Sequence, residues 1–116
     1  MCHVLIIEDE WLIADYVEHL AREAGATTVD IVDCETDAVR SADGRCPEII
    51  LSDVNLRFGT GPIAVCTIQE RWGPIPVIFI TATPADCVPR HAQSVVLTKP
   101  LNANAFAEAF NRLVPS

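Results

Sequence analysis

The chain has 116 residues, half of which are apolar, and carries a formal net charge of −8. A chain of this length can bury one compact core without disulfide or metal cross-links, so we expect a single domain over residues 1–116. Nucleic-acid binding depends on Lys and Arg side chains that neutralise phosphates. The excess of acidic residues therefore predicts no direct contact with DNA or RNA.

The sequence also argues against membrane insertion, secretion and thiol-based metal or redox chemistry. No segment approaches the roughly 20 consecutive apolar residues that cross a membrane. A strand-like segment begins almost directly after Met1, which leaves no room for a signal peptide. The five cysteines are odd in number, dispersed, and form no C-x-x-C pair. We expect reduced thiols, a cytoplasmic location and no membrane association.

Five short runs of apolar, mostly β-branched residues predict five buried strands. The runs are nearly continuous rather than alternating, a pattern typical of a parallel sheet that is covered on both faces. They are Val4–Ile7, Val29–Val32, Ile49–Leu51, Val77–Ile80 and Val95–Leu97.

Helical patterns separate the strands. The first covers Trp11–Ala24, and Gly25 offers a C-terminal stop. Its apolar face is expected to carry Leu12, Ile13, Tyr16, Val17, Leu20 and Ala24. A second, shorter helix is expected over Glu35–Ala42.

The later helices differ in how clearly the sequence marks them. Gly61-Pro62 opens a helix that Gly73-Pro74 closes, because Pro suits the first helical turn. Its apolar face is expected to carry Ile63, Cys66 and Ile68. The segment Thr83–Ala92 contains two prolines, so the fourth helix should be short or irregular, whereas Asn102 caps a clear last helix. This alternation of strands and helices predicts a three-layer α/β/α sandwich with right-handed crossovers.

Polar side chains that can carry chemistry follow the predicted strands. In an open parallel sheet, ligands bind beyond the carboxyl ends of the strands. The residues that end the first, third, fourth and fifth strands are Glu8 and Asp9, Asp53, Thr81, and Lys99, which is the only lysine of the chain. The sequence therefore places three carboxylates, a hydroxyl and an ammonium group at one edge.

Three carboxylates at one edge favour a bound cation, because like charges and burial both oppose ionisation. Oxygen ligands without nearby His or Cys favour Mg²⁺. An aspartate can also attack phosphorus and form an aspartyl phosphate, while a metal, a lysine and a hydroxyl stabilise the transferring group. The edge contains each of these protein groups.

Four segments that carry these residues resemble the signature of response regulator receiver domains. The segments are Val4-Leu5-Ile6-Ile7-Glu8-Asp9-Glu10, Ile49-Ile50-Leu51-Ser52-Asp53-Val54-Asn55, Ile80-Thr81-Ala82 and Thr98-Lys99-Pro100. The resemblance implies a flavodoxin-like sheet with the strand order 2-1-3-4-5. It also implies that residues 1–116 form one stand-alone, chemotaxis-receiver-like domain with no output domain.

The resemblance assigns a role to each residue at the edge. Asp9 and Asp53 would bind Mg²⁺ directly, Glu8 through water, and Asn55 through its backbone carbonyl. Asp53 would accept a phosphoryl group from a sensor histidine kinase or a histidine phosphotransfer protein.

The resemblance also concerns the response to phosphorylation. Lys99 would pair with the phosphoryl group, Thr81 would move toward it, and the Lys99-Pro100 peptide bond would be cis.

Two positions depart from the usual receiver pattern. Val96 stands where receivers usually have Tyr or Phe, and Arg57 stands where proline is common. Pro76–Ala82 partly resembles the P-F-x-F-A-T-G variant of stand-alone alphaproteobacterial receivers. These departures leave open how phosphorylation is passed on.

Several functions remain compatible with the sequence. As a receiver, the chain would act as a switch on a downstream protein, a relay or a phosphate sink, with no enzymatic activity beyond slow self-phosphorylation from small donors and self-dephosphorylation. One alternative is a Mg²⁺-dependent enzyme of phosphatase or Toprim type, although Asp53-Val54-Asn55 lacks the second acid of their D-x-D pair. The other alternative is an interaction scaffold that does not depend on phosphorylation.

Overall fold

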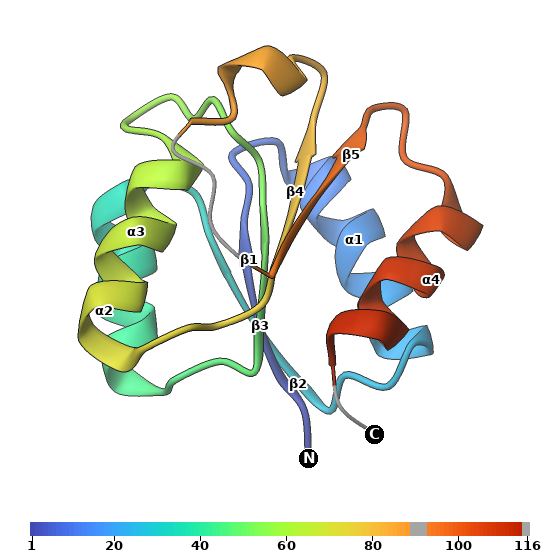
Figure 1. The fold of residues 1–116 in the computed structure, drawn as a ribbon, viewed down its shortest axis with the longest axis horizontal. Coiled ribbons are helices and arrows are strands. Elements are labelled where there is room, and N and C mark those ends of the chain that lie inside the picture. Colours follow the sequence, from blue (N-terminus) through green and yellow to red (C-terminus); the bar gives the residue numbers. More distant parts are fainter. Residues whose placement is uncertain (89–92, 115–116) are drawn as a thin grey trace.

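The computed structural model describes residues 1–88 and 93–114, and it alternates strands with helices along the chain (Figure 1). The strands are β1 (His3–Ile7), β2 (Thr28–Val32), β3 (Ile49–Ser52), β4 (Val77–Thr81) and β5 (Ser94–Thr98). The α-helices are α1 (Trp11–Glu23), α2 (Glu35–Gly44), α3 (Gly61–Trp72) and α4 (Ala103–Leu113), and a 3₁₀ turn, η1, covers Pro84–Asp86. Each predicted strand is present and extends at most one residue further at either end.

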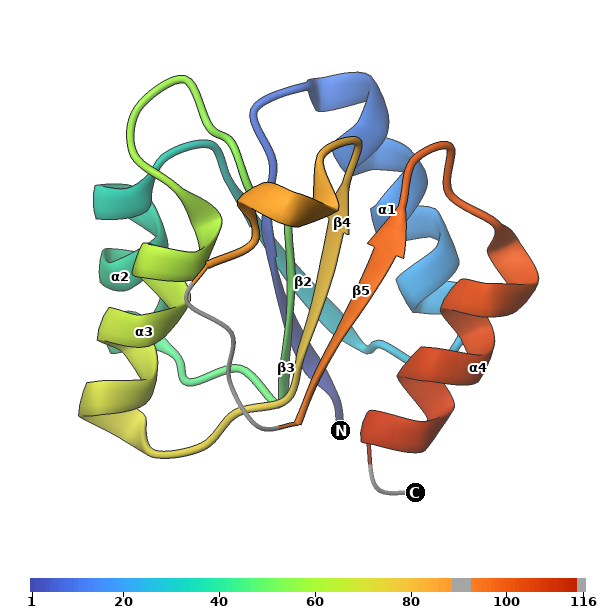
Figure 2. The same cartoon turned by 45° about the horizontal axis from the view of Figure 1, so that its top comes forward.

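The strands form one parallel sheet in the order β2-β1-β3-β4-β5. Helices α2 and α3 cover one face, and α1 and α4 cover the other (Figures 1 and 2). The predicted three-layer sandwich and its flavodoxin-like strand order are therefore confirmed. With this order, β3 lies in the middle of the sheet, and its carboxyl end is flanked by the ends of β1 and β4.

Alternating side chains of the central strands supply two cores. Ile6 and Leu51 point toward α1 and α4, where Phe106 and Phe110 stack with ring centroids 5.8 Å apart. Leu5 and Phe79 belong to the core beneath α2 and α3. Because both faces of the central strands are covered, their sequences are apolar except for one polar residue at an end of each strand.

The two outer strands are less buried than the sequence predicted. Val29–Val32 and Val95–Leu97 are mostly half-buried, and Ile31 is 45% exposed. Both segments belong to edge strands, which have a neighbouring strand on one side only. An apolar run indicates a strand, but it does not indicate whether that strand lies at an edge.

The predicted apolar faces of two helices were partly wrong. In α1, Leu12 is 68% exposed, and the helix instead buries the small residues Ala14 and Ala21 alongside Val17 and Leu20. In α3, the expected face residue Ile63 is 47% exposed. The residues that α3 buries are Gly61, Pro62, Ala64, Val65 and Ile68. Close packing on the sheet selects small side chains at these positions, whereas hydrophobicity alone favours the large ones.

The chain between β4 and β5 matches the prediction of a short or irregular fourth helix. Its described part contains only the three-residue turn η1, and Pro89 lies outside the described residues. The last helix, α4, begins as expected, because the Asn102 side chain accepts a hydrogen bond of 2.9 Å from the Ala105 amide.

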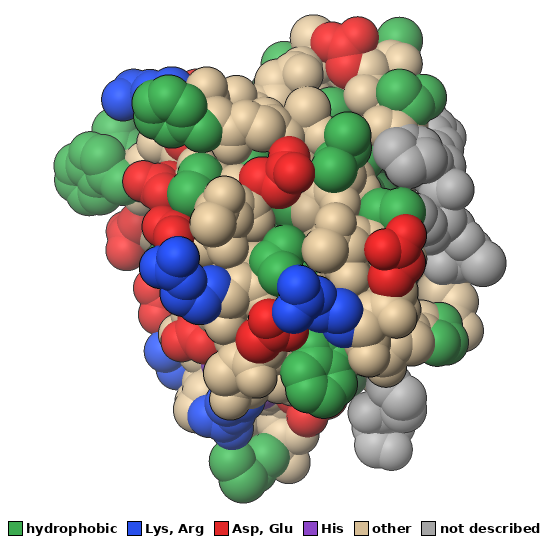
Figure 3. Space-filling view, turned by 90° about the vertical axis from the view of Figure 1, so that its left-hand side faces the viewer, with side chains coloured by type: hydrophobic (Ala, Val, Ile, Leu, Met, Phe, Trp, Pro, Cys, Tyr) green, Lys and Arg blue, Asp and Glu red, His purple; other side chains and the backbone are tan. Residues whose placement is uncertain are grey.

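The outer surface of α2 and α3 carries charges of both signs among apolar side chains (Figure 3). An ion pair of 2.5 Å between Arg71 of α3 and Asp43 of α2 joins the two helices there. The five cysteines are all free, as expected. Across residues 1–88 and 93–114, none of the helices has both the length and the apolar character needed to span a bilayer.

Candidate functional site

The carboxyl ends of β1, β3 and β5 bring four of the predicted site residues together. Glu8, Asp9 and Asp53 each offer a carboxylate oxygen within 4.8 Å of the others. Lys99 lies between two of these acids, with its Nζ atom 3.3 Å from Glu8 Oε1 and 3.4 Å from Asp53 Oδ2. The edge therefore combines a compact group of hard oxygen donors with one ammonium group.

Burial makes it unfavourable for all the acids of this cluster to be ionised at once. Glu8 is 4% exposed and Asp53 is 9% exposed, so water screens their charges poorly. Burial, followed by the charge of Asp53, raises the pKa of Glu8 to about 7, although Lys99 partly opposes the increase. Burial alone would lower the pKa of Lys99, but the charges of Asp53 and Glu8 outweigh it and raise that pKa. The single positive charge of Lys99 does not balance the three carboxylates. A divalent cation together with Lys99 would balance them.

The raised pKa of Glu8 should make the metal-free protein less stable as the pH rises. A glutamate side chain in water has a pKa of 4.5, and in the fold the value is about 7, so the native state holds the proton more tightly than the unfolded state does. Between these two values stability is expected to fall with rising pH, by up to about 3 kcal/mol. Urea unfolding in EDTA at pH 5 and pH 8 measures the loss.

The variant Glu8→Gln isolates this contribution, because it keeps the shape of the side chain and removes the titration. We expect Glu8→Gln to lose much less stability between pH 5 and pH 8 than the wild type. Glu10→Gln, at an exposed neighbouring position, is the matched control and should behave as the wild type. If Glu8→Gln retained the full pH dependence, another group would be responsible.

Asp53 is held in place by the backbone around it. Its amide donates to the Ile7 carbonyl of β1 at 2.8 Å, and its Oδ1 atom accepts a 2.7 Å hydrogen bond from the Val54 amide. The Ser52 hydroxyl donates to the Asp53 carbonyl at 2.7 Å. The Oδ2 atom faces Lys99. The carboxylate therefore has a fixed orientation at the end of the central strand.

Thr81 ends β4 but is hydrogen-bonded away from the acidic cluster. It is buried, and its Oγ1 atom accepts a 2.9 Å hydrogen bond from the Thr83 amide and lies 3.3 Å from the Thr83 hydroxyl. Asn55 is exposed, and its side-chain amide donates to Thr83 Oγ1 at 2.9 Å and to Asp86 Oδ2 at 3.2 Å. The Asn55 side chain is thus hydrogen-bonded to the loop after β4, whereas the predicted metal role belongs to its backbone carbonyl.

Thr83 was not identified from the sequence, although it links Thr81 to Asn55. The one feature of the sequence that could have indicated Thr83 is its position two residues after Thr81. The sequence offered no sign that the two threonines share a hydrogen bond, because that depends on the turn that follows β4.

The Asp9 carboxylate has a partner in the loop after β3. Its Oδ2 atom accepts a 2.7 Å hydrogen bond from the Arg57 amide. The Lys99-Pro100 peptide bond is cis, as expected, and the Lys99 amide donates to the Thr81 carbonyl at 2.8 Å.

The donor set at this edge fits Mg²⁺. The three acids supply only oxygen ligands, and two of them are buried. A second acidic group, Asp33, Cys34 and Asp37, lies at the start of α2, and both of its acids are exposed to solvent. It is less suited to a hard cation, because it includes a thiol and its acids are well hydrated.

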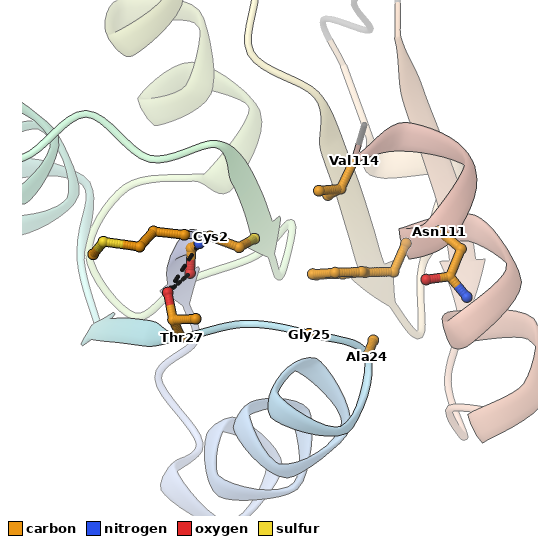
Figure 4. Close-up of a pocket in the computed structure, with 8 residues that line it drawn as sticks. Cys2, Ala24, Gly25, Thr27, Asn111 and Val114 are labelled. Carbon is orange, nitrogen blue, oxygen red and sulfur yellow. Dashed lines mark hydrogen bonds between the residues drawn. The ribbon is translucent and has the colours of Figure 1, made fainter. Parts of the chain in front are cut away.

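A separate hollow of about 470 Å³ lies at the opposite end of the sheet (Figure 4). It is bounded by the N-terminal segment, the turn after α1 and the end of α4, and the Cys2 amide donates to Thr27 Oγ1 beside it at 2.9 Å. Its described lining residues carry no charged side chain. The groups suited to phosphoryl chemistry are therefore at the carboxyl ends of the strands.

The fold and this edge together define a flavodoxin-like α/β protein with an acidic pocket at the carboxyl ends of its strands. A family model described as the response regulator receiver domain matches residues 4–111. The chain belongs to the response regulator receiver domain family.

Among curated proteins, the chain is similar to the phyllosphere-induced regulator PhyR of Methylorubrum extorquens. The two are 37% identical over 82 residues, which cover 70% of this chain and 31% of PhyR. The chain thus spans about a third of the length of this relative.

Among solved structures, the chain is also similar to receiver domains and to PhyR proteins. The PhyR receiver domain of Erythrobacter litoralis is 30% identical, with a TM-score of 0.87, and the match covers 97% of this chain and 88% of that one. PhyR of Bartonella quintana, described as an anti-anti-sigma factor, is 32% identical with a TM-score of 0.81, covering 97% and 46%. The receiver domain of the Pseudomonas aeruginosa sensor histidine kinase PA1611 is 25% identical, with a TM-score of 0.85, covers 99% and 98%, and holds a magnesium ion in its active-site cleft.

Proposed function

We propose that this chain accepts a phosphoryl group on Asp53 in a two-component or phosphorelay pathway and that Mg²⁺ is required. The observation that carries this proposal is the position of Lys99, whose ammonium group lies between the Glu8 and Asp53 carboxylates. A positive charge at this point would balance the charge of an incoming phosphoryl group. Family membership supports a signalling role.

The transfer would take place at the fixed Asp53 carboxylate. One of its oxygens attacks the phosphorus of a phosphohistidine on a sensor histidine kinase or a histidine phosphotransfer protein. A new O–P bond forms as the P–N bond breaks, and the histidine nitrogen leaves with the electron pair and takes up a proton. Lys99 stabilises the charge on the phosphoryl oxygens during this step.

The acidic residues would hold the metal. Asp9 and Asp53 would bind Mg²⁺ directly, Glu8 through water, and Asn55 through its backbone carbonyl. When bound, Mg²⁺ supplies further positive charge for the phosphoryl oxygens. The magnesium ion in the related PA1611 receiver supports this assignment.

Phosphorylation would alter the hydrogen bonds of Thr81. Its hydroxyl now interacts with Thr83, and a bond to the phosphoryl group would replace that interaction. Val96 is half-buried and packs against the core beneath α2 and α3, so no aromatic side chain at this position can follow the movement.

A downstream protein would receive the signal. The PhyR structure from Bartonella quintana is described as an anti-anti-sigma factor, a term for proteins that act on an anti-sigma factor. We therefore propose an anti-sigma factor as the first candidate partner of this chain. The net charge of −8 disfavours direct action on a nucleic acid.

Acetyl phosphate, a small phosphodonor, tests the proposed function. With Mg²⁺ present, intact-mass measurement should detect one added phosphoryl group per chain, and excess EDTA should prevent the addition because the oxygens of the donor would lack their counter-charge. Far-UV circular dichroism should show the same folded protein in both samples, which separates loss of the metal from loss of the fold.

The remaining outcomes distinguish the alternatives. Normal Mg²⁺ binding without any phosphoryl addition would contradict the proposal and favour an interaction scaffold. Continuous hydrolysis of varied phosphate esters would contradict it in favour of a Mg²⁺-dependent phosphatase.

A further inference from the structure

The loop that follows β3 covers residues 55–60, and backbone contacts join its two ends. Asn55 and Thr60 form an antiparallel bridge, and the Gly61 amide donates to the Val54 carbonyl at 2.9 Å. Between them, the Arg57 amide donates to Asp9 Oδ2 at 2.7 Å. This short loop therefore contacts one proposed metal ligand, Asp9, and contains another, Asn55.

Glu35, the first residue of α2, contacts this loop three times. Its Oε2 atom accepts a 3.1 Å hydrogen bond from the Thr60 amide. Its own amide donates to the Phe58 carbonyl at 3.3 Å. A Cβ atom on Gly59 would lie 2.5 Å from Glu35 Oε2 and 2.6 Å from Glu35 Cβ, so only glycine permits this approach. One carboxylate from a different layer of the sandwich thus holds the loop.

The position of Glu35 at the start of a helix does not by itself require that its carboxylate bind the loop after β3. An acid in the first turn of a helix normally interacts with the free backbone amides and the dipole of its own helix. Here the Glu35 carboxylate instead binds Thr60, and the residue that precedes it, Cys34, does not cap α2 with its side chain. The Glu35 side chain is half-buried between the helix and the loop.

We propose that Glu35 is a positioning residue for the Mg²⁺ site. By fixing Thr60 it fixes the bridged residue Asn55, and it keeps the Arg57 amide against Asp9. Two proposed ligands from different strand ends are therefore placed before the cation arrives. This inference rests on the proposed function, and it gives the first residue of α2 an influence on the affinity for Mg²⁺ that acts through the loop after β3.

Isothermal titration calorimetry with Mg²⁺ alone tests the proposal on the full chain. Glu35→Ala should raise the Kd for Mg²⁺ about tenfold, as is typical when a partner that orients a ligand is removed. Glu35→Gln should restore most of the affinity, because its amide oxygen can still accept from Thr60. Asp37→Ala removes the same charge from the same helical turn, where Asp37 faces Arg40 at 3.9 Å, and it should leave the Kd within about twofold of the wild type.

A second pair of variants tests the contact between Glu35 and the loop by changing a glycine of the loop. Gly59 and Gly73 both have φ of +87°, a backbone conformation that favours glycine, so alanine is strained at each. Only Gly59→Ala would also displace Glu35, because no described residue lies within 4 Å of the Cβ position of Gly73. Gly59→Ala should therefore weaken Mg²⁺ binding, and Gly73→Ala should not, with urea unfolding to establish that each is folded.

The outcomes separate this inference from the proposed function. If the wild type fails to bind Mg²⁺, both the proposed function and the role of Glu35 are contradicted. If the wild type binds Mg²⁺ and is phosphorylated, but Glu35→Ala and Gly59→Ala bind as tightly as the wild type, only the role of Glu35 is overturned. Equal weakening by Asp37→Ala or Gly73→Ala would also overturn it.

Discussion

Replacing Lys99 by alanine is expected to change Mg²⁺ binding and phosphorylation in opposite directions. The ammonium group lies 3.3 Å from one carboxylate and 3.4 Å from another, so its removal leaves more negative charge for a cation to bind. The Kd for Mg²⁺ should therefore fall severalfold. The same change removes the group that stabilises the phosphoryl oxygens, and the rate of phosphorylation should drop by about 10²- to 10³-fold.

Calorimetry with Mg²⁺ and the time course of phosphoryl addition from acetyl phosphate measure the two effects on the same preparation. Lys99→Arg is the control, because it keeps the charge and should retain much of the rate with little change in the Kd. A loss of both metal binding and phosphorylation in Lys99→Ala, despite a folded protein, would contradict the proposed role of the ammonium group.

The second large effect is expected for Gly61→Ala. A Cβ atom at this position would lie 1.9 Å from the Asp53 carbonyl oxygen and 2.3 Å from Ser52 Oγ. The backbone oxygen belongs to a strand end in the centre of the sheet and cannot rotate away. The start of α3 must therefore move, and we expect a cost near the upper end of the range of about 1–3 kcal/mol that is typical of overpacked sites. Phosphorylation should also slow, because Asp53 is displaced.

Urea unfolding gives the change in the free energy of unfolding. Gly44→Ala is the matched control, because Gly44 is the last residue of α2 and, apart from its chain neighbours and the backbone of its own helix, no described atom lies within 4 Å of its Cβ position. That substitution should be neutral or stabilise by up to about 1 kcal/mol, since alanine favours the helix. If Gly61→Ala were as stable as the wild type, the close approach of α3 to Asp53 would not matter energetically.

This glycine illustrates what the sequence could and could not predict. The sequence indicated Gly61 as the start of a helix, but the reason that glycine is needed there became visible only in the fold. Its role follows from contact with the Asp53 backbone and not from a positive φ angle. The sequence predicted the sheet well because every strand produced an apolar run that began or ended near a turn signal.

The side of a helix that is buried was harder to predict. Ile63 was expected on the buried face of α3 but is exposed, whereas its neighbours Ala64 and Val65 are buried. Leu12 was likewise expected on the buried face of α1, but it is 68% exposed. Hydrophobicity alone does not distinguish a large exposed side chain from a core residue when several of the positions packed on the sheet hold small side chains.

The candidate site was predicted as a set of residues, because strand order and strand ends determine which residues meet. Glu8, Asp9, Asp53 and Lys99 do lie together. The contacts that hold them were not predicted. Glu35 is 18 residues from Asp53 in the sequence and reaches the loop only because α2 packs beside it, which no local pattern encodes.

The position of the phosphoryl group tests the central claim most directly. The protein is phosphorylated with acetyl phosphate and Mg²⁺, treated with borohydride to reduce any acyl phosphate to an alcohol, and mapped by peptide mass spectrometry. We expect the reduced residue to be Asp53 and to be absent from Asp53→Asn treated in the same way. Modification of another residue in the wild type, or unchanged modification of Asp53→Asn, would contradict the assignment of Asp53 as the phosphoacceptor.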